Sequence, residues 1–381
     1  MKLPHLLATV ALVCALTGAA ATAAAQDRVA VKAKRIVTGR GADLVDATML
    51  VENGRVKAIG RELAIPAGYR TVDLGAAVVA PGFVDVASAA GAPNDLVESS
   101  VGIDDRGRTA EAVELAHRDF PLLAASGITT AVILPGDRSL VSGRGCAVKT
   151  GDRARLAEAE GPVRLTVTPS ALSRARRPSS YADALEMLRV FLDESKGGRG
   201  QPAMIEFARG KRPGLCTVSS AAEIRDVLDL RRRYDLDLAL IGAVDLQRAL
   251  DGLAVKGLSV ALAAPGPEAD RRVSGLGALA EAAGITVAYF GDTPRRHPDV
   301  LRQGAITAVR HGLSSRAGLA SITSAPAEIA GIGDRVGALA VGMDADFVVL
   351  SGDVLDARSR VLETWIDGRR AWAAKKERKA R

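Results

Sequence analysis

Short apolar runs alternate with turn residues over the first part of the chain. These runs, which are typical of strands, span 29–37, 47–52, 55–59, 69–72 and 77–79. Asn53-Gly54 separates two of them, and this dipeptide between alternating runs is a strong signal for a tight hairpin. The chain therefore opens with a region rich in β-strands.

From residue 81 the pattern changes to apolar runs separated by amphipathic stretches. The runs are 82–86, 128–134, 163–168, 214–218, 238–242, 258–263 and 285–290. Helices are predicted at 180–192 and at 220–233, where Ser220-Ala221-Ala222-Glu223 is a capping-box sequence. Such alternation favours a parallel barrel over a doubly wound sheet. Seven barrel strands are clear, and the eighth is predicted at either 203–207 or 144–149.

The end of the chain returns to strand patterns after a predicted helix at 313–324. Runs at 347–350 and 361–366, followed by Asp367-Gly368-Arg369, predict a hairpin. Strands at both ends of a barrel predict a small composite β-sandwich built from 26–80 and 337–374, with the barrel in 81–336. The predicted fold class is α/β, with a regular or distorted (β/α)8 TIM-type barrel.

The first 25 residues have the pattern of a secretory signal peptide. Lys2 precedes an apolar stretch at 6–16, and small residues at 21–25 offer cleavage sites. This stretch is shorter than the roughly 20 apolar residues of a transmembrane helix. We therefore expect an exported protein, periplasmic or secreted, without a transmembrane segment.

Charge and composition narrow the possible partners. The formal net charge is +7, of which Lys2 carries +1 and the basic tail 375–381 carries +4, which leaves only about +2 on the body. The aromatic content of 3% and the predicted export argue against nucleic-acid binding. Cys146 and Cys216 could pair after export, or they could be small buried residues. The chain has only 4 histidines, and imidazole is a principal ligand of zinc and related ions.

Two groups of motifs carry a family resemblance. The first comprises 51–60, 72–75 and Ala80-Pro81-Gly82-Phe83-Val84-Asp85, and the second comprises 323–327, 334–337 and 341–350. Together they resemble the opening and closing segments of the amidohydrolase superfamily. Residues 127–136, with Ser142-Gly143-Arg144-Gly145, are similar to its imidazolonepropionase-like branch. The resemblance implies a barrel with a composite β domain, and one or two metal ions that activate water to hydrolyse C–N bonds other than peptide bonds.

The metal-binding histidines of that family are missing here. Where the family has Pro-Gly-x-x-Asp-x-His-x-His, this chain has Ala87 and Ala89 in place of the histidines. Alignment on the flanking segments places Thr217 and Gly242 at two further histidine positions. The family's last-strand aspartate is matched by Asp292. For the bridging carboxylated lysine of two-metal relatives, no residue matches clearly, and Lys149 is the nearest lysine after a strand-like run.

Three functional hypotheses follow. The first is a degenerate, metal-free amidohydrolase-like protein, or pseudoenzyme, which binds a small ligand or a partner and needs no cofactor. The second is an active hydrolase of a cyclic amide or dipeptide-like substrate, which uses Asp292 with an oxygen-ligated metal or with none. The candidate oxygen ligands are the carboxylates of Asp85, Asp95, Glu98, Asp104, Asp105 and Asp292. The third is an envelope interaction module that docks through the basic tail. The oligomeric state stays open.

Overall fold

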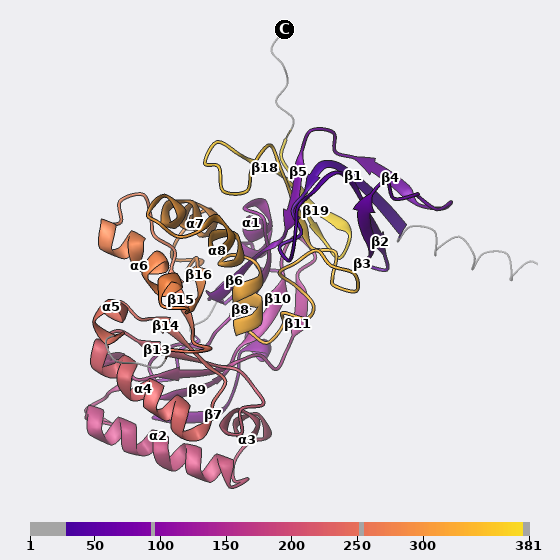
Figure 1. Cartoon of the computed structure of the whole chain (residues 1–381). Coiled ribbons are helices and arrows are strands. Elements are labelled where there is room, and N and C mark those ends of the chain that lie inside the picture. Colours follow the sequence, from indigo (N-terminus) through magenta and orange to yellow (C-terminus); the bar gives the residue numbers. More distant parts are fainter. Residues whose placement is uncertain (1–27, 93–95, 251–254, 376–381) are drawn as a thin grey trace, which may run out of the picture.

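The computed structural model describes residues 28–92, 96–250 and 255–375, and it has an α/β fold (Figure 1). The predicted signal peptide lies outside the described residues, as does the basic tail beyond its first residue. Within the described ranges, no helix combines the length and the apolar character needed to cross a membrane. The strands form three sheets, one of which joins the two ends of the chain.

The sheet that joins the chain ends has eight strands, in the order β19-β18-β17-β5-β1-β2-β3, with β4 paired to β1. They are β1 (Arg28–Ile36), β2 (Leu44–Glu52), β3 (Arg55–Arg61), β4 (Arg70–Asp73), β5 (Val78–Pro81), β17 (Phe347–Leu350), β18 (Val361–Ile366) and β19 (Arg369–Ala373). Antiparallel pairing of β5 with β17 connects the early strands to the late ones. The limits of a separate composite domain, at 26–80 and 337–374, stay a prediction.

Both hairpins predicted from the sequence are confirmed. β2 pairs with β3 across Asn53 and Gly54, whose φ angles of 52° and 77° suit a tight turn between twisted strands. β17 pairs with β18. The sequence patterns did not predict β19, which follows the turn at Asp367-Gly368 and pairs with β18.

All seven barrel strands predicted from the sequence are present as parallel strands. They are β6 (Phe83–Ser88), β8 (Ile128–Ile133), β12 (Val163–Thr166), β13 (Gly214–Val218), β14 (Leu238–Gly242), β15 (Ser259–Ala263) and β16 (Thr286–Phe290). β12 to β16 pair in sequence order within one sheet. β6 and β8 pair in another sheet. The carboxyl ends of these strands lie where a family member would hold its active site.

The (β/α)8 barrel predicted from the sequence, regular or distorted, does not close in the described part of the chain. A bent antiparallel segment stands between β8 and β12: β10 (Cys146–Lys149) pairs with β8, and β9 (Val141–Arg144) pairs with β12. The bend falls at Gly145, where a Cβ atom would lie 2.6 Å from the carbonyl oxygen of Ile133. This segment includes 144–149, one of the two candidates for the eighth strand. It runs antiparallel to β8 and β12, the barrel strands on either side, and therefore cannot complete a parallel barrel.

The other candidate for the eighth strand, 203–207, is helical. It lies within α3 (Pro202–Ala208), which has a proline in its first turn. Proline suits this position because its missing N–H would have no partner in the helix. Two short strands extend the sheets instead: β7 (Ile103–Arg108) pairs with β9, and β11 (Arg155–Glu158) pairs with β10.

No ladder joins β6 to β16 among the described residues, and other groups hold these two strands together. Oδ1 of Asp85 on β6 accepts hydrogen bonds from the backbone N–H of Gly291 at 3.1 Å and of Ala87 at 3.3 Å. The carbonyl oxygens of Ser321 and Ile322 accept from one residue on each strand. A buried carboxylate and an inserted backbone segment thus replace regular strand pairing at this seam.

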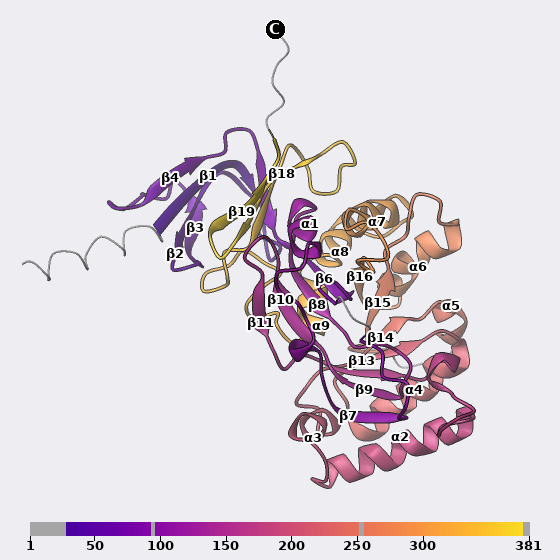
Figure 2. The ribbon, with the colours of Figure 1, turned by 180° about the vertical axis from the view of Figure 1, so that it is seen from behind.

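The remaining helices cover the outside of the parallel strands and one end of their inner face (Figure 2). They are α1 (Asp119–Ala125), α2 (Tyr181–Lys196), α4 (Ala221–Tyr234), α5 (Leu246–Ala249), α6 (Arg271–Ala282), α7 (Val300–Arg310), α8 (Ser315–Ala320) and α9 (Ser324–Ile329). The predicted capping box is confirmed: Ser220 Oγ accepts from Glu223 N, and the Glu223 carboxylate accepts from Ser220 N. The helix predicted at 313–324 is shorter in the structure, where α8 ends at Ala320 and α9 begins at Ser324.

Alternate residues of the parallel strands pack on opposite sides. Cys216 and Leu240 belong to the large apolar cluster shared with the outer helices. Leu215 and Ile241 belong to a second cluster, which includes Ile329 from α9 and fills part of the inner side. Cys146 and Cys216 are both buried and unpaired. The outer helices cover one side of these strands, and α9 covers part of the inner side. The carboxyl ends of the strands remain uncovered on the inner side, and a cavity can open there.

Candidate functional site

A cavity of about 590 Å³ lies at the carboxyl ends of the parallel strands. The five positions singled out from the sequence all line it: Ala87, Ala89, Thr217, Gly242 and Asp292. They come from the ends of β6, β13, β14 and β16. The family alignment therefore selected residues that the fold brings together, although they are far apart in the sequence.

The end of β6 presents methyl groups where the family has imidazoles. The backbone there is held in place, since Ala87 N donates to Asp85 and Ala89 N donates to the carbonyl oxygen of Thr293 at 2.8 Å. A methyl group has no lone pair to give a metal ion. The scaffold of the family's first strand is thus present without its ligand atoms.

At Gly242 the backbone conformation, and not only the missing side chain, differs from what a histidine would need. Its φ angle is 88°, and a Cβ atom at this position would lie 2.9 Å from the carbonyl oxygen of Val218. An L-residue such as histidine is strained in this conformation. Thr217, at the other aligned position, offers a hydroxyl whose Oγ1 is buried and lacks a hydrogen-bond partner. A neutral hydroxyl is a poor substitute for imidazole in holding a transition metal.

The remaining histidines do not rebuild a metal site. Nδ1 of His117 lies 3.1 Å from an oxygen of Asp119. His297 is exposed, and His311, the C-cap of α7, places Nδ1 2.8 Å from the carbonyl oxygen of Thr307. The part of the chain that the structure describes has no group of three or more His, Cys, Asp or Glu side chains that could hold a metal ion. The residues present therefore do not fit the metal that the family implies.

Of the loop carboxylates that are candidate oxygen ligands, Asp95 lies outside the described residues, and Glu98 and Asp104 bind the backbone of local turns. Glu98 accepts a hydrogen bond from the backbone N–H of Ser100, and Asp104 accepts from the N–H groups of Arg106 and Gly107. Neither of these carboxylates lines the cavity.

Asp292 contributes a partly exposed carboxylate to the cavity. Its φ angle is 61°, and its Oδ1 lies 3.1 Å from Nη1 of Arg295, three residues further along. Because Arg295 is largely exposed, this pair can open to admit a ligand at little cost.

Asp85 is fully buried beside the cavity, and its Oδ2 has no hydrogen-bond partner. Burial raises the pKa of this carboxyl from 3.8 to about 7, and the charge of Asp292 adds to the rise. The N–H groups of Gly291 and Ala87 act in the opposite direction. Asp85 is therefore a proton-holding group at the seam between β6 and β16.

Arg164 on β12 lines the cavity and was not singled out from the sequence. It is only 8% exposed, and its Nε and Nη1 atoms have no hydrogen-bond partner. Burial lowers the pKa of its guanidinium to about 10, and the nearby charge of Asp137, which also lines the cavity, opposes this effect. One feature of the sequence points to this residue: an arginine stands between Val163 and Leu165 in a strand that is predicted to be buried.

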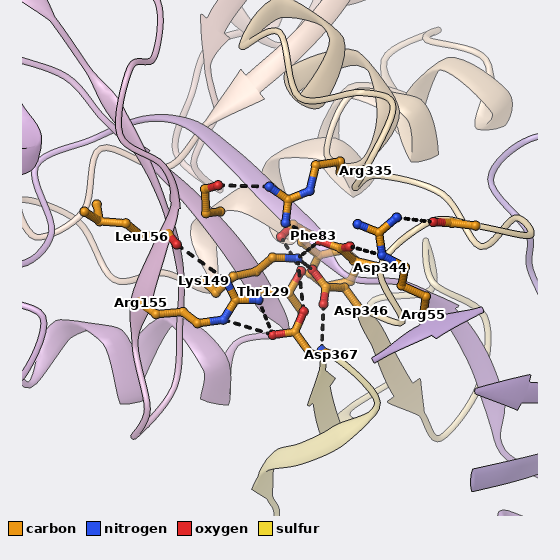
Figure 3. Close-up of polar contacts among 12 residues, drawn as sticks. Arg55, Phe83, Thr129, Lys149, Arg155, Leu156, Arg335, Asp344, Asp346 and Asp367 are labelled. Atoms are coloured by element: carbon orange, nitrogen blue, oxygen red, sulfur yellow. Dashed lines mark hydrogen bonds and ion pairs between the residues drawn. The ribbon is translucent and has the colours of Figure 1, made fainter. Parts of the chain in front are cut away.

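Lys149 lies away from this cavity, in a buried ion-pair cluster between the strand layers (Figure 3). Its Nζ pairs with Asp346, with Asp344 at 2.9 Å and with Asp367 at 3.8 Å. Burial disfavours the charge, but these carboxylates outweigh it and raise the pKa of Lys149. Lys149 thus joins β10 to the C-terminal strands, and it does not occupy the place of a bridging lysine.

The C-terminal part of the chain matches known amidohydrolases in sequence. The model of the amidohydrolase family matches residues 281–371, a segment that contains Asp292 and the strands β17 and β18. Amidohydrolase tasK of Hapsidospora irregularis is 38% identical over 85 residues, which are 22% of this chain and 9% of that protein. The chain thus matches only a small part of tasK.

Solved structures extend the likeness to nearly the whole chain. An amidohydrolase from Thermotoga maritima MSB8 superimposes with a TM-score of 0.79 at 21% identity, over 91% of this chain and 100% of that one. Molinate hydrolase gives a TM-score of 0.58 at 14% identity, over 90% and 94% of the two chains. These likenesses show a shared fold, and membership of the imidazolonepropionase-like branch stays a prediction. The C-terminal segment thus resembles the amidohydrolase family in sequence, and the chain shares the fold of solved amidohydrolases.

Proposed function

We propose that this protein binds a small molecule in the cavity at the strand ends and does not carry out metal-dependent hydrolysis. One observation carries the proposal: Ala87, Ala89, Thr217 and Gly242 stand at the family's histidine positions and line a cavity that is open. A protein kept only as a scaffold could fill this space with apolar side chains. An open cavity without ligand atoms for a metal favours binding without metal chemistry.

The size and lining of the cavity suit a small organic ligand. Its volume of about 590 Å³ is within the range of roughly 300–1,000 Å³ that is usual for such sites. Leu96, Leu134 and Phe290 supply apolar surface, and Arg164 and Asp292 supply charge. Apolar walls with a few polar groups are typical of sites that fix the orientation of a bound molecule.

We further propose that this binding takes place outside the cytoplasm, in the periplasm or the surrounding medium. The support is the signal-peptide pattern of residues 1–25. The two buried cysteines place no demand on the redox state of that compartment, because burial raises the pKa of each thiol to about 12 and keeps it unreactive.

The proposal is tested by blocking the cavity. Ala87→Phe places a large side chain at the cavity wall, and Ala182→Phe adds the same side chain at an exposed position on α2 as a matched control. A library of small polar and apolar compounds is screened for those that raise the melting temperature. We expect hits with the parent protein and the control variant that are lost with Ala87→Phe. Hits that persist in the blocked variant would place binding elsewhere and reject the proposal.

The alternative hydrolase function is tested with the same proteins. Cyclic amides and dipeptides are incubated with the protein, with and without added zinc, manganese or magnesium. We expect no turnover above that of the Asp292→Asn variant. Turnover that requires Asp292 would instead support the alternative, in which this carboxylate moves a proton within the cavity.

A further inference from the structure

We propose that Arg164 is the anchor for the carboxylate of a small, singly charged ligand whose body is apolar. This inference rests on the proposed function, because it concerns the same cavity. It adds the chemical class of the ligand and the residue that recognises it.

The Arg164 guanidinium lacks hydrogen-bond partners although it is buried. Its Nε and Nη1 atoms have no hydrogen-bond partner among the described residues, and the charge of Asp137 acts on it from nearby without a recorded ion pair. A buried charge without a partner is costly, and buried arginines are normally paired. Because Arg164 also lines the cavity, a bound anion can supply the missing partner. The planar guanidinium matches a carboxylate with two parallel hydrogen bonds.

Two hydroxyl groups lie on the same face of the sheet as Arg164. Thr166 lies two residues after Arg164 on β12, so both side chains point to the same side of the sheet. Thr166 pairs in register with Thr217 on β13. The Oγ1 atoms of both threonines are buried and without partners. One guanidinium and two hydroxyls, all without partners, thus gather on the inner face of β12 and β13.

The charged side chains around the cavity favour a ligand with a single negative charge. Asp137 and Asp292 also line the cavity, and Arg295 is already paired with Asp292. A second negative charge on the ligand would lack a cation and would be repelled by these carboxylates. This favours a monocarboxylate over a phosphate ester, which carries close to two charges at neutral pH.

The apolar side chains of the cavity favour a ligand whose body is apolar. Leu96, Leu134, Ile241 and Phe290 line the same cavity as Arg164. Apolar surface buried against these side chains contributes roughly 25 cal/mol per Å². The carboxylate then fixes the orientation, and the apolar body supplies most of the affinity.

The test uses matched probes that differ in charge. Butyrate, hexanoate, 3-phenylpropionate and 4-phenylbutyrate are titrated by calorimetry against the full chain, each beside its neutral amide, with phenylpropyl phosphate as a doubly charged probe. We expect a monocarboxylate to bind at least tenfold more tightly than its amide and than the phosphate. Arg164→Met should remove this preference, and Arg232→Gln, at an exposed position on α4 away from the cavity, should leave it within about threefold.

A second measurement separates an anchor from a structural arginine. Without ligand, Arg164→Met should keep or raise the melting temperature, because it removes a buried charge that has no partner. A large fall in melting temperature would show that Arg164 holds the fold together and would overturn the inference.

The remaining outcomes distinguish the two proposals. If acids and amides bind equally, and Arg164→Met binds both, then the anchor is refuted while the cavity remains a ligand site. If no carboxylate binds but other compounds are lost on cavity blocking by Ala87→Phe, then the ligand class is refuted. If nothing binds in the cavity, the proposed function itself fails.

Discussion

The buried carboxyl of Asp85 should make the free energy of unfolding depend on pH. Its carboxyl is fully buried and has a pKa of about 7, against 3.8 in its ordinary state. The folded protein therefore holds a proton that the unfolded chain releases between these two values. By linkage, the free energy of unfolding falls as the pH rises through this window, by about 1.4 kcal/mol per pH unit, and levels off above pH 7. The full loss from this group is about 4 kcal/mol.

The substitution Asp85→Asn isolates this contribution. An asparagine resembles the protonated carboxyl: its Oδ1 can still accept from Gly291 and Ala87, but it does not ionise. We expect the variant to gain stability over the parent as the pH rises from 4 to 8, by up to about 4 kcal/mol. Urea unfolding of both proteins at several pH values measures the difference, in which contributions common to both proteins cancel.

Asp85→Ala is the matched control for this experiment. It also lacks the titrating group, so its stability relative to the parent should rise with pH in the same way. It leaves the buried N–H of Gly291 without its acceptor, however, which should make it about 1–3 kcal/mol less stable than Asp85→Asn at every pH. A difference between Asp85→Asn and the parent that stays constant from pH 4 to pH 8 would refute the reasoning.

Two further predictions concern the scaffold. Lys149→Met leaves the buried carboxylates of Asp344 and Asp346 without their shared cation. Chemical denaturation should then show that the free energy of unfolding falls by about 3–5 kcal/mol. A fall below about 1 kcal/mol would argue against a stabilising role of this ion-pair cluster. Ser220→Ala removes one half of the capping box with Glu223 on α4, and it should lower the free energy of unfolding by about 1 kcal/mol. An unchanged midpoint of unfolding would contradict a stabilising role of this cap.

The strands of the fold could be predicted well from the sequence. The ranges 214–218 and 238–242 coincide with β13 and β14, because a buried parallel strand is a continuous apolar run with turn residues at its ends. The pairing between strands was harder to predict. The segment 141–149 bends at Gly145 and pairs antiparallel with two different strands, and its short apolar runs carry no signal of that direction.

The location of the cavity could also be predicted, but only part of its chemistry. The family motifs placed Ala87, Ala89 and Asp292 at its wall, because strand ends in such a fold converge. Arg164 does not stand at a position where the family has a histidine, so the family motifs did not select it. The lack of partners for its guanidinium depends on the packing of surrounding strands, which no local pattern reveals.

The metal content of the purified protein tests the central claim most directly. The full chain is incubated with an excess of zinc, manganese or iron(II), passed over a desalting column and analysed by mass spectrometry of the elements. The account predicts less than about 0.1 metal ion per chain, and a melting temperature that a chelator leaves unchanged. A retained metal near one ion per chain, with a melting temperature that falls when the metal is removed, would contradict it.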